Sequence, residues 1–369
     1  MNLQEDNMDK QNKKKGILTK LVNRYFIDGL SGMAMGLFST LIVGLIIKQI
    51  GSLIGDNVIG ITLSRIGSIA SILTGAGIGI GIAHKLKTSS LVMYSSAVTG
   101  LVGAYAGKII SGQAFVEGDV LLIGPGEPLG AFVAVIVGIE IGRLVSGKTK
   151  IDIILTPITT IIAGSSIGLI IGPSISAFMN WLGDIIEFAT VQQPFVMGIL
   201  VSVLMGMILT LPISSAALSI ILKLNGLAAG AATVGCATQM IGFAVASYRE
   251  NKVNGLIAQG LGTSMLQVPN IVKNPRIWIP PIVVSAILGP ISTKVFMMKN
   301  NAYGGGMGTS GLVGQIMTWD TMIESESPGV LITKIIVLHI VLPAVMTLAL
   351  SEGLRKIGWI KYGDMKLDS

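Results

Sequence analysis

Apolar runs of about 20 residues recur along almost the whole chain, and the charged residues are concentrated between these runs. An α-helix of that length spans the roughly 30 Å hydrocarbon core of a bilayer. Of the 369 residues, 51% are hydrophobic, only 12% are charged and 48 are glycine. Glycine is typical of membrane helices, because small residues let neighbouring backbones approach closely. The sequence therefore predicts an all-α integral membrane protein.

We expect about ten transmembrane helices. They cover residues 26–50, 59–83, 90–110, 130–146, 152–173, 194–213, 227–247, 256–271, 277–297 and 330–350. With both termini in the cytoplasm, most short loops obey the positive-inside rule. Basic residues in the region 249–252 and in the region 294–299 do not obey it, and an extra re-entrant element there would explain them. Residues 174–187 form either an interfacial helix or an extension of the fifth span.

The polar termini are predicted to lie outside the membrane. Residues 1–24 are rich in lysine and too polar to pack a core, so we expect a disordered basic cytoplasmic tail there, and residues 360–369 form a second tail. The net charge of +7 arises largely from basic residues at helix ends, where they set topology, so we expect no nucleic-acid partner. The single cysteine, Cys236, excludes a disulfide framework, and no spacing indicates a metal or another cofactor.

Residues 122–132 place a carboxylate in a backbone interrupted by glycine and proline. Glu127 follows Gly124, Pro125 and Gly126 and precedes Pro128. A charged group at membrane depth is costly and is found mainly where it faces a polar pathway. Broken helical segments at that depth are a known feature of transporter binding sites. The pattern therefore favours a solute site at Glu127, and the alternative is a carboxylate that caps a neighbouring helix.

A second glycine-rich break, residues 305–310, has the same place in the second half of the chain as residues 123–128 have in the first. Thr-Lys-Ile begins an apolar run after each break, at 149–151 and at 333–335. We therefore expect two inverted five-helix repeats, residues 25–190 and 191–359, each with a re-entrant or broken segment. The alternative is the self-similarity common to glycine-rich membrane proteins.

Further polar side chains are candidate substrate ligands, because hydroxyls, amides and imidazoles all form hydrogen bonds with polar solutes. For each the alternative is a structural role, in bonding the backbone or in holding membrane helices together. Besides Glu127, these candidates are Thr309, Ser310 and Gln315 in the second break, Gln239, Gln267 and Asn270 on adjacent predicted spans, and His339 in the last span.

The element Gly-Glu-Pro-Leu-Gly-Ala-Phe at residues 126–132 resembles the Thr-Glu-Pro-Ile-Glu-Phe element of the sugar permease subunits, IIC, of the bacterial phosphotransferase system. The stretches 210–216, 235–243 and 262–270 are similar to the perfringolysin-regulator-like branch of that group. The resemblance implies a homodimer in the bacterial plasma membrane. It also implies a permease for a small polar solute, most plausibly a sugar, with phosphorylation by a separate IIB partner.

The resemblance assigns a catalytic role to Glu127, which would accept hydrogen bonds from adjacent sugar hydroxyls and take up a proton during phosphoryl transfer. The second Glu of the family element is replaced here by Ala131 or one of its neighbours. Two other functions remain open. One is an ion- or proton-coupled transporter or channel for another polar solute, with a proton path through Glu127, Glu140 and His339. The other is a membrane sensor or regulator that retains the permease fold without transport.

Overall fold

A computed structural model describes residue 21 and residues 23–367, so most of the predicted N-terminal tail lies outside the described residues. The α-helices are α2 (Leu30–Leu37), α3 (Val43–Ile54), α4 (Val58–Ile72), α5 (Thr74–Lys85), α6 (Ser90–Ala104), α7 (Ala106–Ile110), α8 (Pro128–Val145), α9 (Asp152–Thr190), α10 (Pro194–Thr210), α11 (Ser215–Ile221), α12 (Gly226–Ala246), α13 (Tyr248–Ile257), α14 (Val268–Lys273), α15 (Ile279–Pro290), α16 (Val313–Met322), α17 (Pro328–Ile336) and α18 (Leu342–Lys356).

Short π-helical turns continue several of these helices, at Asn23–Gly29, Phe38–Ile42, Ala258–Gly262, Ile291–Val295 and Val337–Val341. Three 3-10 turns lie at Ser264–Gln267, Pro275–Trp278 and Ser310–Leu312. The strands β1 (Phe115–Val116) and β2 (Asp119–Val120) pair in a small antiparallel hairpin. Helix thus accounts for nearly all the regular structure, as the sequence predicts.

Six helical segments in the described part of the chain are long and apolar enough to cross a membrane. A seventh is formed if α4 and α5, which are bent by 52° at their junction, are counted as one span. Helices α6 and α10 are also apolar but shorter. These segments overlap predicted spans, and the count of about ten spans stays a prediction. The eighth predicted span, residues 256–271, has no matching continuous helix. There the chain passes from a π-helical turn through extended Thr263 to a 3-10 turn and α14. The expected all-α membrane fold is confirmed, and the eighth segment is not one continuous helix.

Glycines set the packing of the first helical hairpin, in which α2 and α3 lie against α5 and α4. A Cβ atom added to Gly36 would lie 2.1 Å from the carbonyl oxygen of Gly77, and one added to Gly67 would lie 2.4 Å from that of Gly44. Real Cβ atoms do not approach so closely, so only glycine allows this backbone contact. The abundance of glycine in the sequence therefore reflects helix packing, as in other membrane helices.

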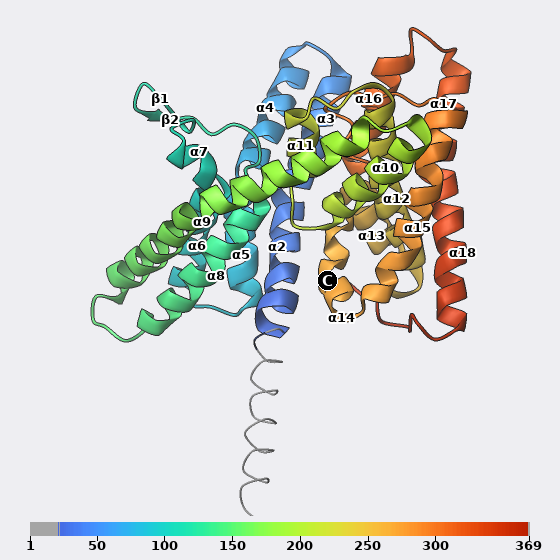
Figure 1. The fold of residues 1–369 in the computed structure, drawn as a ribbon. Helices are drawn as coiled ribbons and strands as arrows, with labels where there is room; N and C mark the ends of the chain where they lie inside the picture. The colour runs from blue at the N-terminus through green and yellow to red at the C-terminus, as the bar shows by residue number, and fades with distance from the viewer. Residues whose placement is uncertain (1–20, 22, 368–369) are drawn as a thin grey trace, which may run out of the picture.

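The helices form two groups, α2 to α8 and α10 to α18, and α9 crosses from one to the other (Figure 1). At 39 residues α9 is roughly 58 Å long, far more than a bilayer core requires. It contacts α6, α7 and α8 in the first group and α10 and α11 in the second. Residues 174–187 continue this helix, so they extend the fifth span, which is one of the two predicted alternatives.

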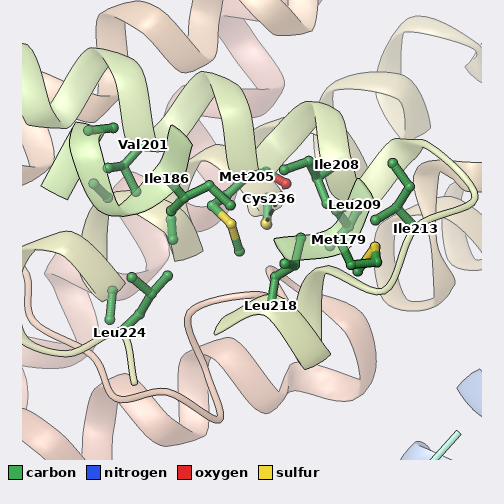
Figure 2. Packing of buried hydrophobic residues seen from close by; sticks show 14 of the residues in the cluster. Met179, Ile186, Val201, Met205, Ile208, Leu209, Ile213, Leu218, Leu224 and Cys236 are labelled. Atoms are coloured by element: carbon green, nitrogen blue, oxygen red, sulfur yellow. Dashed lines mark hydrogen bonds between the residues drawn. The ribbon is translucent and has the colours of Figure 1, made fainter. Parts of the chain in front are cut away.

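An apolar cluster fixes the C-terminal half of α9 to the second group (Figure 2). Met179 and Ile186 of α9 pack in the same cluster as Met205 of α10, Leu218 of α11 and Cys236 of α12. The Cys236 thiol is fully buried there. This cluster joins α11 to α9, the helix that also packs against the first group.

Candidate functional site

The backbone around Glu127 is held in a defined, non-helical shape. Gly124 and Gly126 have φ angles of +75° and +71°, which favour glycine. The Tyr105 hydroxyl donates a hydrogen bond to the carbonyl oxygen of Gly124. The Glu127 amide donates one to the carbonyl oxygen of Ala104 at 2.8 Å. The end of α6 therefore fixes the segment immediately before α8.

The Glu127 carboxylate lies at the point where the two halves of the chain meet. The backbone amide of Ser214, just before α11, forms a hydrogen bond with the carboxylate, and the positive charge of Lys108 attracts it. The side chain makes no capping bond to its own helix, α8. Its Oε2 atom is buried and has no hydrogen-bond partner among the described residues. The contact with Ser214 is what the capping alternative predicts, because Ser214 lies at the N-terminus of a neighbouring helix, α11. The Oε2 atom has no partner among the described residues, so a ligand could still bind there.

The second break is packed against α11 and α12. The Asn300 amide group donates hydrogen bonds to the Thr233 hydroxyl at 2.7 Å and to the Thr318 hydroxyl at 2.9 Å. The Ser215 hydroxyl donates to the carbonyl oxygen of Gly306 at 2.7 Å. Ser215 and its neighbour Ser214 thus connect the second break to the Glu127 segment.

A cavity of about 690 Å³ lies between these segments. That volume is within the usual range for small-molecule sites, which are mostly apolar with a few placed polar groups. From the first half its wall contains residues of α3 and α4 together with Gly124, Pro125 and Pro128, which flank Glu127; Glu127 itself is not among the wall residues. From the second half it contains Ser214, Ser215, Thr263, Tyr303, Gly306 and Ser310. Both breaks therefore contribute to one cavity.

Of the predicted ligands in the second break, Ser310 lines this cavity, and its buried hydroxyl has no partner among the described residues. Thr309 is buried and donates to the carbonyl oxygen of Gly260, so its hydroxyl is already used. Gln315 is buried with its amide 3.2 Å from Nδ1 of His339. Neither member of that pair is in the cavity wall.

The three predicted amides on neighbouring segments also lie outside the cavity wall. Gln239 accepts a hydrogen bond from the Trp278 indole at 2.9 Å, while its own amide nitrogen has no partner in the described part of the protein. Asn270 donates to Gln267 at 2.8 Å, and both donate to backbone carbonyls of residues 365–366. The role of these amides, of Thr309 and of the Gln315–His339 pair in binding a solute stays a prediction.

The groups proposed for a proton path lie in separate surroundings. Glu140 forms ion pairs with Arg24 at 2.8 Å and with Arg143 at 3.2 Å. His339 contacts Gln315, as described above. The structure records no hydrogen bond from either residue to Glu127 within the described residues.

Sequence reasoning missed several residues of the cavity wall. Ser214 and Ser215 belong to the stretch 210–216 that carries part of the family resemblance, but they were not predicted as ligands. Lys48 is a cavity residue in an otherwise apolar run, which is a signal for a polar pathway. Thr263 and Tyr303 gave no comparable signal, since a single threonine or tyrosine is common in any membrane helix.

Comparisons with known proteins identify the family. A search of curated proteins and a search of solved structures each gave no significant match. The family model described as phosphotransferase system, EIIC, matches residues 27–367. That match covers both halves of the chain, both breaks and every residue of the cavity wall. The chain therefore belongs to the EIIC family, the membrane permeases of the phosphotransferase system.

Proposed function

We propose that this protein carries a sugar across the bacterial plasma membrane and that the sugar binds in the cavity between the two breaks. The observation that carries the proposal is the buried, unpartnered Oε2 atom of Glu127 at the junction of the two halves. A buried polar atom without a partner costs free energy unless a ligand satisfies it. A sugar hydroxyl is a donor of the right chemistry for a carboxylate oxygen.

The composition of the wall supports a polyhydroxylated solute. Ser214, Ser215 and Ser310 bring hydroxyls to the same cavity, and Tyr303 contributes an aromatic ring. Most of the remaining wall is aliphatic, which suits the C–H faces of a sugar ring. We propose Glu127 and Ser310 as direct ligands. Glu127 is assigned because Pro125 and Pro128, on either side of it in the chain, line the cavity. Gln239, Gln267, Asn270 and His339 have no such neighbours on both sides in the wall, and the side chains of Thr309 and Gln315 contact Gly260 and His339 instead. These six residues would reach a solute only after a larger rearrangement.

We further propose that a separate IIB protein phosphorylates the sugar at the cytoplasmic face. The Cys236 thiol is fully buried and donates toward the Met205 carbonyl, so it cannot present a phosphoryl group to solvent. In this proposal Glu127 accepts the proton of the attacking hydroxyl. This assignment gives Glu127 both a binding and a catalytic role.

The proposed topology has both termini in the cytoplasm and two inverted five-helix repeats, and the protein works as a homodimer. The matching order of the two breaks and of the two Thr-Lys-Ile stretches supports the repeat. The homodimer is proposed from the family resemblance alone. The exposed apolar side chains of α9, such as Ile153, Ile162 and Ile170, would face lipid or the second copy.

Uptake of a panel of radiolabelled sugars into proteoliposomes tests the proposal. We expect a sugar phosphate to form, inside or outside the proteoliposomes, only when a phosphorylated IIB protein is present. We expect Glu127→Gln to abolish the formation of this sugar phosphate. Glu140→Gln is the matched control, because Glu140 lies in an exposed ion-pair cluster. Accumulation of unmodified solute driven by a proton gradient would instead support an ion-coupled transporter. Absence of binding and uptake for every sugar would contradict the proposal.

A further inference from the structure

Residues 258–267 separate the cavity from the C-terminal end of the chain. On one side of this segment Gly262, Thr263 and Met265 line the cavity. The backbone here is π-helical, then extended at Thr263, then 3-10, so it lacks a regular hydrogen-bond ladder. Such backbone is tolerated at membrane depth only where protein or water satisfies it. What packs behind the segment therefore determines its shape.

A chain of buried amides occupies the side of the segment that faces away from the cavity. Gln267 donates to the Oε1 atom of Gln259 at 2.8 Å and to the carbonyl oxygen of Met365 at 3.0 Å. Asn270 donates to the Oε1 atom of Gln267 at 2.8 Å and to the carbonyl oxygen of Lys366 at 2.9 Å. Two of the acceptors are thus backbone atoms of the C-terminal residues.

We name residues 357–367 the C-terminal strap. Its Ile360 and Met365 side chains are buried with Phe243, Ile271 and Ile277. Asn251 holds the strap on both sides, since it donates to the Met365 carbonyl and accepts from the Leu367 amide, each at 2.8 Å. The strap is thus a packed part of the protein.

A buried ion pair anchors the beginning of the strap. Arg355 and Glu250 pair at 2.8 Å with side-chain exposures of 8% and 1%. The Gly363 amide of the strap donates to the same Glu250 oxygen. Asn274, just after α14, donates to Asp364 at 2.7 Å. The strap therefore contacts both ends of the region that contains the non-helical segment.

The two ends of the cavity differ in what closes them. At one end Lys48, Gln49 and Ser52 belong to the last turns of α3, next to the α3–α4 connection. That connection lies at the end of the molecule opposite α14 (Figure 1). At the other end the wall is Thr263 and Met265, with the amide chain and the strap behind them. A solute that crosses the protein must displace this second wall.

We propose that the C-terminal strap is the gate at this end of the cavity, with Gln267 and Asn270 as positioning residues that couple it to Thr263. This inference rests on the proposed function, because it assumes that the solute passes through the cavity. While the strap is docked, the amides are satisfied and the segment 258–267 closes the cavity. When the strap undocks, the amides lose their carbonyl acceptors, and the segment is released.

Thiol accessibility tests the closed state without any solute. In a Cys236→Ser background, Thr263→Cys should react with a membrane-impermeant maleimide only from the side of the α3–α4 connection. Adding Asn270→Ala and Gln267→Ala should raise the rate from the strap side by about tenfold, since each lost buried hydrogen bond favours the open form. Gln192→Ala is the matched control, because its amide bonds only the Phe188 carbonyl on the surface. Unchanged reactivity from the strap side, or strong reactivity from that side in the parent, would overturn the proposal.

A reversible cross-link tests the motion in a chain that keeps Gln267 and Asn270. The Leu367 amide donates to the Asn251 side chain at 2.8 Å, so the two residues are neighbours. Cysteines at these positions in the Cys236→Ser background are therefore the pair to oxidise to a disulfide across the strap, with its formation checked by non-reducing electrophoresis. We expect oxidation to stop uptake while sugar binding from the α3–α4 side is retained, and reduction to restore uptake. Full uptake in the oxidised protein shows that the strap is not a gate. Loss of binding in the uncross-linked parent would instead contradict the proposed function.

Discussion

The carboxylate of Glu127 contacts the backbone amide of Ser214, although the two residues belong to different halves of the chain. Ser214 precedes α11, and its neighbour Ser215 bonds Gly306 of the second break. One short stretch thus joins the two glycine-rich breaks. Any movement of one half relative to the other changes the surroundings of the Glu127 carboxylate. Solute binding and conformational change are therefore expected to be coupled at this contact.

The position of the Glu127 segment depends on Tyr105, whose hydroxyl bonds the Gly124 carbonyl and lies 3.3 Å from that of Ile72. Tyr105→Phe should lower the affinity for sugar by roughly tenfold, since the Gly124 carbonyl loses its hydrogen bond to the Tyr105 hydroxyl and the segment loosens. The thermal midpoint should fall by only a few degrees. Isothermal titration calorimetry measures the affinity. Tyr94→Phe, at an exposed position, is the control, and equal affinities of the two variants would count against this role.

Gly36→Ala should destabilise the first helical hairpin. The new Cβ atom would lie 2.1 Å from the Gly77 carbonyl oxygen, so the two helix backbones must separate. Overpacking of this kind costs about 1–3 kcal/mol. Unfolding in mixed micelles of detergent and denaturant measures the change. Gly329→Ala is the control, because no atom lies within 4 Å of its Cβ position. A variant as stable as the wild type would show that the helices can move apart freely.

Within the part of the chain that the structure describes, the cavity wall has one charged side chain, that of Lys48. Its positive charge should favour sugars that carry a carboxylate or a phosphate over neutral sugars. Lys48→Gln should therefore weaken binding of an anionic sugar by about tenfold and leave a neutral analogue nearly unchanged. Competition binding at two ionic strengths measures both affinities. Equal losses for the two sugars would show that Lys48 acts through packing and not through charge.

Local sequence pattern predicted most of the helices, because a run of about 20 apolar residues has few alternatives to a spanning helix. It also located Glu127, since glycine and proline around a carboxylate disturb that pattern visibly. Residues 256–271 were predicted as a span because their apolar content is high. Their true shape depends on Gln267 and Asn270 bonding residues 365–366, almost one hundred positions away in the chain. No local pattern records such a contact.

The same non-local contacts limited the prediction of ligands. Gln267 and Asn270 are polar groups in an apolar segment, and the sequence alone cannot distinguish a sugar from a backbone carbonyl as their partner. Ser310, a predicted ligand in the second break, lies in the cavity wall, and its role in binding a solute stays a prediction. Lys48 and Ser214 entered the site only through the packing of α3 and α11. Even within the second break, Thr309 and Gln315 point to other partners than the cavity, so local sequence does not decide which polar side chain faces it.

Equilibrium binding of sugars to purified wild type and Glu127→Gln tests the central claim most directly. The glutamine keeps the size of the side chain but removes the charge that makes the buried Oε2 atom a strong acceptor. We predict saturable binding of one sugar class by the wild type and a loss of at least about a hundredfold in the variant, with the thermal midpoint unchanged or raised. Equal affinity of the two proteins for that sugar would contradict the account.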